Sequence, residues 1–584
     1  MKHAPPTRPA YRWEVAPATP AAEALAGRLR TGTLVAQLLI NRGITDDDAA
    51  RTYLQPKLTD LHDPERLAGA TEAAERIARA VRDGEPITLY GDYDVDGMTG
   101  TAILYRGLRM LGATVDYYIP HRIDEGYGLN AKAIDALADR GTSLVVTVDC
   151  GVTAVDCAEQ AARRGLSMII TDHHDLAATP PRADAIVHPT IDPSYPNGNL
   201  CGAGVALKLM WQVFRAHQGT RRVSEELKTF LLDATCLAAL GTIADVVPLV
   251  GENRAIAMFG LRGLPTTDHP GLRSLIAAAG LTGRRVGGYD VGFMLAPRLN
   301  AAGRMGHAVD AADLLIRPEQ LDDCAAAAAE LTKLNTLRQT TEREIFAEAA
   351  ERVVRLGMDR DDRRVIVLAD ERWHAGVIGI VAARLVRRFA RPAVLIALDG
   401  RTGRGHGSGR SIEGYPLARA LAACDEHLAG SGGHAMAAGL RIDADTVEAF
   451  TEALTAHAAE AITPEMLRPV LPVDAEATLG DLSLPVARQI EAMAPFGAGN
   501  PPVILAVRDA VLHAAPRRMG RRGDTLGLLL SDGRRRLRCV GFGMGDLVDR
   551  LAGVRTVHVA GEPTLNQFNG YTTVEMHLKD VQWD

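Results

Sequence analysis

Between residues 71 and 250 the sequence alternates short β-prone runs with stretches of helical periodicity, and this alternation restricts the fold more than any other feature. Helical patterns such as Ala131–Arg140 and Ala154–Arg164 separate the β-prone runs. The expected strands are Ile87–Tyr90, Val115–Ile119, Leu144–Val148, Met168–Thr171 and Ala185–Val187. Such alternation predicts an α/β fold with a mostly parallel sheet covered by helices. Ligands of such sheets bind at the carboxyl ends of the strands.

Three carboxylates follow the first of these strands, in the stretch GDYDVDG. Asp92, Asp94 and Asp96 alternate along the chain, so an extended backbone would project all three to one side. Crowding these charges is costly unless a cation or a proton compensates, and oxygen-rich clusters suit Mg²⁺ or Mn²⁺. An acidic turn in solvent is the alternative. A calcium-binding loop fits less well, because no helix leads into the stretch and no Glu closes it.

Further polar residues stand at other strand and helix ends. Asp149 follows Leu144–Val148, the triplet 172–174 (DHH) follows Met168–Thr171, and Asp245 ends a long apolar run. Each has an ordinary structural explanation, such as a helix cap for Asp149 or a core position for His173. Together they predict a cluster of Asp92, Asp94, Asp96, Asp149, His173 and Asp245 at one sheet edge. Mixed oxygen and nitrogen ligands favour Mn²⁺ over Ca²⁺, and so many acids suit two ions about 3.5–4 Å apart.

Composition sets the remaining limits. A chain of 584 residues with 47% hydrophobic and 23% charged residues predicts a globular protein of about two to four domains. We expect no membrane span and no secretion signal. The seven cysteines form no CxxC pair, which predicts a reducing, cytoplasmic location. The net charge of −7 gives no global sign of nucleic-acid binding, although such binding requires only a local basic groove.

The segments outside residues 71–250 carry fewer signals. The composition of residues 1–70 predicts a proline-rich extension with short helices. This extension would cap another part of the protein or bind a partner. The pattern of residues 251–359 predicts helices, including Leu321–Leu334 and Thr340–Leu356. These two stretches would form one long connection between lobes or be ordinary bundle helices. Residues 360–462 return to an α/β pattern. There we expect two glycine-rich turns, Gly403–Arg410 and Gly430–Gly433, that could hold phosphate through backbone amides and arginine.

Residues 467–584 predict five short strands and a small β-barrel of the OB type. Arginines cluster here, at positions 517, 518, 521, 522, 534, 535, 536 and 538. Phe542, Phe568 and Tyr571 could stack on bases, as in sequence-neutral binding of single strands. A charged hairpin exposed to solvent is the alternative.

Several motifs resemble those of a known family. GDYDVDG, the later VDCG and TDHH resemble the DHH phosphoesterase superfamily. Further motifs narrow the resemblance to the RecJ exonucleases: PHR (120–122), EGYG (125–128), APRLNAAGR (296–304), GSGRS (407–411), GGH (432–434), AAG (437–439) and PFGAGNP (495–501). The resemblance implies a DHH lobe and a DHHA1-type lobe joined by a long helix, with a C-terminal OB-type barrel. Its expected domains are 1–70, 71–250, 251–359, 360–462 and 467–584.

The resemblance also implies an activity and a set of site residues. The activity would be metal-dependent 5′→3′ hydrolysis of single-stranded DNA to mononucleotides in recombination and repair, with two Mn²⁺ or Mg²⁺ ions. The six residues of the predicted cluster would be ligands, Asp149 bridging both ions, and His174 would face the scissile phosphate. The implied substrate-binding residues are Arg122, Tyr127, Asn300, Arg304, Ser408, Arg410, Gly433 and His434. A helicase and a single-strand-binding protein are implied partners of a monomer.

Two alternatives stay open. A related phosphodiesterase of short oligoribonucleotides or cyclic dinucleotides would share the metal motifs without needing the barrel or the long helix. A catalytically silent, RecJ-like DNA-binding scaffold would keep the fold but would not need the complete set of Asp and His residues.

Overall fold

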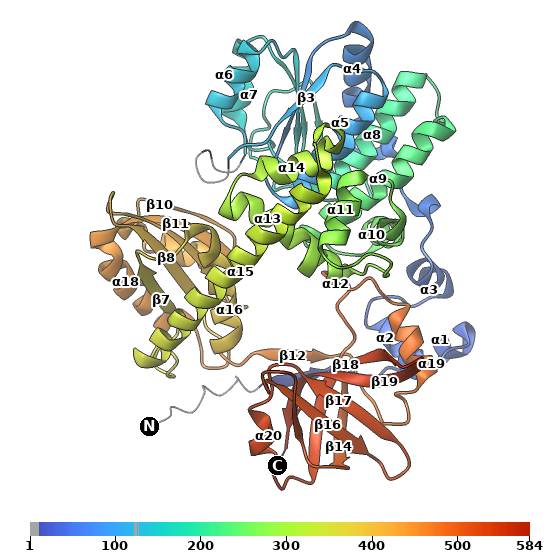
Figure 1. Ribbon diagram of the computed structural model, residues 1–584, viewed down its shortest axis with the longest axis vertical. Helices are drawn as coiled ribbons and strands as arrows, with labels where there is room; N and C mark the ends of the chain where they lie inside the picture. The colour runs from blue at the N-terminus through green and yellow to red at the C-terminus, as the bar shows by residue number, and fades with distance from the viewer. Residues whose placement is uncertain (1–10, 122–124, 126–127, 584) are drawn as a thin grey trace. The chain divides into compact units, whose positions relative to one another are not determined.

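The computed structural model describes residues 11–121, 125 and 128–583, so Arg122 and Tyr127 lie outside the described residues. The chain forms two compact units (Figure 1). Among the described residues, one unit comprises 11–16 and 336–473, and the other comprises those within 17–335 and 474–583. The five-segment division expected from the sequence stays a prediction.

The larger unit contains the parallel sheet that the sequence predicts. Its strands are β2 (Ile87–Gly91), β3 (Val115–Tyr118), β4 (Leu144–Val148), β5 (Ser167–Thr171) and β6 (Ala185–Val187), in the order β3-β2-β4-β5-β6. All neighbouring pairs are parallel. Because successive side chains of a strand point to opposite faces, the sheet has two cores. Leu89 and Val146 face a core shared with α4 (Ala70–Asp83), α5 (Val95–Met110) and α8 (Gly202–Gln218). Val145 and Ile170 face one shared with α6 (Ala131–Asp139) and α7 (Val155–Arg163).

A group of helices follows the sheet in sequence. They are α9 (Glu225–Ala244), α10 (Gly251–Gly263), α11 (Pro270–Ala278), α12 (Gly288–Asp290), the π-helix η4 (Val291–Leu295), α13 (Ala296–Met305) and α14 (Ala308–Ile316). Helix α9 has the length and hydropathy of a membrane span, contrary to the expectation from sequence. It nevertheless belongs to the protein interior, since residues from Ala234 to Thr242 are buried against α5, α8 and α10. Its apolar composition is that of a core helix.

One uninterrupted helix, α15 (Cys324–Arg355), connects the two units. Its 32 residues cover most of both helical stretches predicted from the sequence, beginning three residues after Leu321 and ending one residue before Leu356. The connecting helix is therefore longer than either predicted stretch.

The smaller unit has a five-stranded sheet in the order β10-β11-β9-β8-β7. Its strands are β7 (Ile366–Asp370), β8 (Ala393–Asp399), β9 (Arg404–Arg410), β10 (Gly430–Gly433) and β11 (Ala437–Asp443), and its helices are α16 (Ala375–Phe389), α17 (Leu417–Ala422) and α18 (Val447–Ala461). The prediction of two glycine-rich turns is wrong, because both segments are strands, β9 and β10. Glycine lets neighbouring side chains approach: a Cβ on Gly407 would lie 2.6 Å from Leu440, and one on Gly409 would lie 2.6 Å from Leu417. In this unit, β1 (Arg12–Val15) also pairs with β12 (Val470–Val473).

The C-terminal strands form the expected OB-type fold in the larger unit. They are β13 (Ala475–Glu476), β14 (Leu505–Leu512), β15 (Arg517–Met519), β16 (Thr525–Ser531), β17 (Arg536–Gly541), β18 (Thr556–Phe568) and β19 (Tyr571–Gln582), with helices α19 (Leu484–Glu491) and α20 (Leu547–Arg550). Pairing of β14 with β16 closes the ring β14-β18-β19-β17-β16. The N-terminal helices α1 (Ala21–Leu29), α2 (Thr33–Ile40) and α3 (Asp47–Leu54) share the hydrophobic core of this sheet.

Candidate metal centre

Three aspartates stand directly after three neighbouring strands of the parallel sheet. Asp92 follows β2, Asp149 follows β4 and Asp172 follows β5. Each backbone amide donates to the neighbouring strand, from Asp92 to Val148 O (3.2 Å), from Asp149 to Thr171 O (3.0 Å) and from Asp172 to Val187 O (3.2 Å). The sheet pairing therefore continues to these residues and brings them to one edge.

Asp94 and Asp96 extend the group on the loop and first turn of α5. Asp94 is the N-cap of α5, and its Oδ1 accepts from the amides of Asp96 (2.9 Å) and Gly97 (3.0 Å). The carboxylate of Asp96 accepts from the amides of Gly202 (2.5 Å) and Ala203 (2.9 Å) at the start of α8. Backbone amides at two helix N-termini thus fix these acids. Burial and the charge of Asp96 raise the pKa of Asp94.

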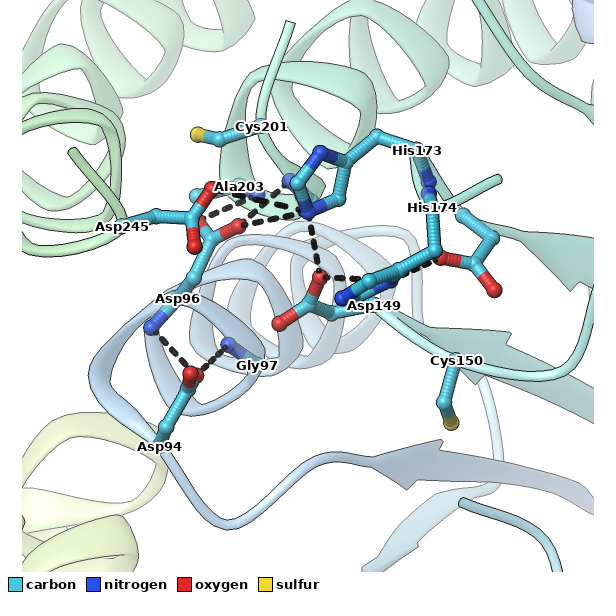
Figure 2. A network of polar contacts seen from close by, with 12 residues as sticks. Asp94, Asp96, Gly97, Asp149, Cys150, His173, His174, Cys201, Ala203 and Asp245 are labelled. Carbon is cyan, nitrogen blue, oxygen red and sulfur yellow. Dashed lines mark hydrogen bonds and ion pairs between the residues drawn. The ribbon is translucent and has the colours of Figure 1, made fainter. Parts of the chain in front are cut away.

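His173 lies in the middle of the cluster, as Figure 2 shows. Its Nε2 is 3.1 Å from an oxygen of Asp149, 3.6 Å from Asp245 and 3.8 Å from Asp96. Ligand atoms within 4.8 Å of one another form three groups: Asp92, Asp94 and Asp149; Asp96, His173 and Asp245; and Asp149, His173 and His174. The structure therefore brings together all six ligands predicted from the sequence, around Asp149 and His173.

The charges in this cluster favour a bound cation. Burial, together with repulsion from Asp96, Asp94, Asp92 and Asp245, raises the pKa of Asp149 well above its usual value. Burial and the charges of Asp96 and Asp94 raise the pKa of Asp245 to about 8. Burial lowers the pKa of His173, which keeps its imidazole neutral and able to ligate. Carboxylate oxygens with one neutral imidazole fit Mn²⁺ or Mg²⁺.

His174 is held at the rim of the cluster by Asp172. Its Nδ1 lies 2.7 Å from Asp172 Oδ1, which also accepts from the amides of His173 (2.8 Å) and His174 (3.2 Å). Burial works to lower the pKa of His174, but the hydrogen bond and charge of Asp172 outweigh it and raise this pKa. The side chain is 40% exposed, so this imidazolium can meet a bound anion.

Sequence reasoning missed several residues that shape the cluster. In the sequence Asp172 stands out only as part of the motif DHH, and no sequence signal indicates that it positions His174. Gly202 and Gly241 allow close packing: a Cβ on Gly202 would lie 2.6 Å from Asp149 Cβ, and one on Gly241 would lie 2.4 Å from Asp96 Oδ1. The run of small residues at Gly202–Gly204 is the only sequence signal for this packing.

A helix-capping role does not explain Asp149. Asp149 does not cap α7, whose N-cap is Ala154. Asp149 instead adopts a φ of 65°, a left-handed conformation that is uncommon for a residue with a side chain. Such outliers concentrate at functional sites. The nearby thiol of Cys150 is no candidate nucleophile, because burial and the acids around it raise its pKa well above the usual value.

Two predicted substrate-binding residues lie on α13 beside the acidic loop. Asn300 and Arg304 are four residues apart on this helix and therefore share a face. A Cβ on Gly303, between them in sequence, would lie 3.7 Å from Tyr93 O in the stretch GDYDVDG.

The other described candidates lie together in the smaller unit. Ser408 and Arg410 point to the same face of β9, and Arg410 Nη1 donates to Ser408 Oγ (3.1 Å). A Cβ on Gly379 in α16 would lie 2.7 Å from Ser408 Oγ, so glycine is required there. Gly433 ends β10 with a φ of 136°, and His434 is exposed directly after it. Register across β10, β11 and β9 aligns Gly433, Ala438 and Gly409, which places this pair and Arg410 at one end of the sheet.

The C-terminal barrel carries the predicted aromatic residues at its surface. Phe542, Phe568 and Tyr571 are 61%, 71% and 78% exposed. Phe568 and Tyr571 face each other across the β18–β19 turn. Among the arginines, Arg518 pairs with Asp549 (2.5 Å) and Arg538 lies 3.8 Å from Glu575.

Comparison with known proteins gives three family matches and many relatives. Residues 86–239 match the DHH family, N-terminal domain; residues 362–460 match the DHHA1 domain; and residues 473–580 match the RecJ OB domain. The "Single-stranded-DNA-specific exonuclease RecJ" of Bacillus subtilis is 38% identical over 572 residues, which cover 98% of this chain and 70% of the relative. The protein of that name from Escherichia coli is 32% identical over 530 residues, covering 88% of this chain and 91% of the relative.

A solved structure is similar over nearly the whole chain. The crystal structure of RecJ from Thermus thermophilus in complex with Mn²⁺ matches with a TM-score of 0.83 and 33% identity, covering 98% of this chain and 80% of the other. A Mg²⁺ complex of the same protein matches with a TM-score of 0.77.

Proposed function

The chain belongs to the RecJ family of single-stranded-DNA-specific exonucleases, and from this premise we propose that it degrades single-stranded DNA in the 5′→3′ direction with two divalent cations. It is a metal-dependent exonuclease of single-stranded DNA. The observation that carries the proposal is the convergence of five carboxylates and His173 at one sheet edge. Repulsion within this group is relieved by bound cations.

The ligand groups suggest how two ions would divide the cluster. Asp92 and Asp94 would hold one ion, and Asp96, His173 and Asp245 would hold the other. Asp149 would serve both, because it belongs to the first group and lies 3.1 Å from His173 in the second. A divalent cation here would polarise the phosphodiester and lower the pKa of water, so that hydrolysis needs no covalent nucleophile.

His174 is the group we assign to the reacting phosphate. Held by Asp172 and partly exposed, its imidazolium would donate to a phosphate oxygen as negative charge develops there. Asp172 acts through His174 and is a positioning residue. Removing such a charge-stabilising donor costs about 10²–10³ in kcat in enzymes that use one.

Each unit carries residues that we propose to bind substrate. Ser408 and Arg410 offer a hydroxyl and a guanidinium on one face of β9, a combination suited to a terminal phosphate. We also assign Arg122 and Arg304 to this phosphate, His434 and Gly433 to the nucleotide near the cut, and Asn300 and Tyr127 to the strand beside it. The exposed aromatic residues of the OB-type barrel would stack on bases.

Partners and compartment are further proposals. Single-stranded DNA is the substrate, and we propose that a helicase and a single-strand-binding protein supply it to a monomeric enzyme in recombination and repair. The free cysteines, five of which are buried with pKa values raised by burial, support a reducing cytoplasm.

An end-labelled oligonucleotide tests the activity and its polarity. With Mn²⁺ and 5′-labelled single-stranded DNA, labelled mononucleotide should appear at once, whereas 3′-labelled DNA should give a slowly shortening ladder. Asp149→Ala should abolish both signals. Cleavage restricted to di- or trinucleotides would favour the short-oligonucleotide phosphodiesterase instead. DNA binding without any cleavage would indicate a scaffold.

A further inference from the structure

The segment that follows Asp245 has a strained backbone. It connects α9 to α10, and its first residue, Val246, adopts a φ of 63°. This left-handed conformation is an outlier for a β-branched residue and persists only where the surrounding structure imposes it. Val246 is 66% exposed, so the packing of its own side chain does not impose the conformation. The contacts that fix the segment come from the residues after Val246.

The side chain of Asn253, on the first turn of α10, binds this segment. Its Nδ2 donates to Pro248 O (3.1 Å) and also to Asn199 O (2.6 Å), so its two N–H groups serve two carbonyls. Its Oδ1 accepts from Asn197 Nδ2 (3.0 Å). Asn253 is fully buried. One side chain therefore ties the segment that follows Asp245 to the segment that precedes α8.

The two segments tied in this way both support one group of metal ligands. Asn199 lies three residues before Gly202, whose amide donates to Asp96 (2.5 Å). The other bonded carbonyl, that of Pro248, lies three residues after Asp245. Both acids belong to the same group of potential ligands. The hydrogen bonds that join the segments therefore act on a single cation site.

The loop PFGAGNP holds the same segment at a neighbouring residue. The amide of Leu249 donates to Ala498 O (2.8 Å). A Cβ on Gly499 would lie 2.8 Å from Pro248 Cβ, so the loop packs closely against the segment. With Leu249 fixed by this loop and α9 buried in the core, the bond from Asn253 to Pro248 O fixes the stretch between them.

We infer that Asn253 is a positioning residue for the cation site formed by Asp96, His173 and Asp245. It holds the strained segment in the conformation that keeps the Asp245 carboxylate 3.6 Å from His173 Nε2. This inference rests on the proposed two-ion function and adds to it a residue that acts only through the backbone it binds. The other cation site stands on the loop between β2 and α5, which Asn253 does not support.

The test titrates the metal-free full chain with Mn²⁺ and follows free Mn²⁺ by electron paramagnetic resonance. Asn253→Ala should raise the Kd of one of the two ions about tenfold, as expected for loss of an outer-shell partner, and leave the other Kd unchanged. Half-maximal cleavage of single-stranded DNA should then require about tenfold more Mn²⁺, with kcat retained at saturating Mn²⁺. Adding Val246→Gly to Asn253→Ala should recover part of the affinity, because glycine adopts this φ without strain.

Gln212→Ala is the matched control. It removes another buried side-chain amide of the same unit, one that donates to Thr71 (3.4 Å) on α4. Both Mn²⁺ Kd values should stay unchanged. If Asn253→Ala does not fold, Asn197→Ala, which removes the donor to Asn253 Oδ1, should show the same selective loss to a smaller extent.

Hydrogen exchange gives a readout that requires neither metal nor activity. In EDTA, the amides of residues 246–250 should exchange faster in Asn253→Ala than in the unmodified protein, whereas those of β2 should not change. Equal weakening of both ions, unchanged affinity for both, or unchanged exchange in residues 246–250 would overturn the inference. Failure of the proposed function is a separate outcome, detected as a single Mn²⁺ site or absence of cleavage in the unmodified protein.

Discussion

Asp149 combines two unfavourable features in one residue. Its φ of 65° is costly for a residue with a Cβ, and its carboxylate is buried among like charges. Strain of this kind costs about 1–3 kcal/mol and persists where the surrounding structure imposes it. Here Asp149 directly follows β4, and the backbone amide of Asp149 donates a hydrogen bond to Thr171 O. The cost is understandable if a bound cation stabilises the ionised cluster.

Asp149→Asn should therefore stabilise the metal-free protein. Asn tolerates the left-handed conformation and removes one charge from a cluster in which ionisation is disfavoured, so the free energy of unfolding in EDTA should rise by about 1–3 kcal/mol. Thermal or denaturant unfolding measures this change. Asp83→Asn, at an exposed site, should stay within about 0.5 kcal/mol. A less stable Asp149→Asn protein in EDTA would contradict the electrostatic account.

Asp172→Asn tests the positioning of His174. The variant keeps the size of the side chain but loses the charge that orients and protonates the imidazole, and loss of such outer partners costs about 10–100-fold in activity. We expect this loss in kcat, with KM for single-stranded DNA nearly unchanged. Asp175→Asn, at an exposed position three residues later, is the matched control. An effect confined to KM would assign Asp172 to substrate binding instead.

Among the helices, α11 has an N-cap, His269, that makes the stability of the protein depend on pH. Its Nδ1 accepts from the amide of Leu272 (3.3 Å) as the N-cap of α11, and its Nε2 lies 2.9 Å from Leu315 O. Burial, aided by the charge of Arg106, lowers the pKa of His269 to about 4. The unfolded chain takes up a proton near pH 6.5, whereas the folded protein does so only near pH 4. Stability is therefore lost as the pH falls between these values.

Replacing His269 should remove this dependence. Between pH 6.5 and 4 the unmodified protein should lose about 3 kcal/mol more unfolding free energy than His269→Asn, which retains a capping oxygen but cannot be protonated. Denaturant unfolding at several pH values, compared between the two proteins, measures the difference. Parallel curves would show that the pKa of His269 is the same in the folded and unfolded states.

The elements that sequence predicts well are those with strong local signals. The strands β2 to β6 read as apolar runs ended by polar residues, and their parallel order brings Asp92, Asp149 and Asp172 to one edge. The strands β9 and β10 were predicted as turns because glycine carries no side-chain alternation to read. The importance of Gly241 was also hidden, since it depends on contact with Asp96, which is far away in sequence.

At the scale of the whole molecule, the N-terminal extension and the C-terminal barrel form one core. Leu38 and Leu39 of α2 are buried in the same cluster as Leu505 and Val559. Arg42 adds a polar link: its guanidinium contacts Asp474 (3.1 Å), Asn500 (3.1 Å) and Pro501 O (2.8 Å), and its side chain is only 6% exposed. Sequence reasoning considered a capping role for residues 1–70, but could not identify the partner because the contacts span more than 400 residues.

Arg42→Ala should weaken the packing between the N-terminal extension and the C-terminal barrel. Removing one partner of a mostly buried ion pair leaves the other uncompensated, and we expect a loss of about 3 kcal/mol in unfolding free energy. Arg28→Ala, which breaks an ion pair with a 47%-exposed arginine, should cost less than about 1 kcal/mol. Equal effects of the two substitutions, measured by denaturant unfolding, would show that Arg42 contributes no more than a surface charge.

We propose that the cluster around Asp149 and His173 holds two catalytic cations. Counting bound Mn²⁺ by titration of metal-free protein, with free Mn²⁺ followed by electron paramagnetic resonance, tests it most directly. We predict two ions per chain for the unmodified protein and weakened binding of both in Asp149→Asn, with loss of exonuclease activity. A single ion per chain, or two ions that bind equally well to Asp149→Asn, would contradict the account.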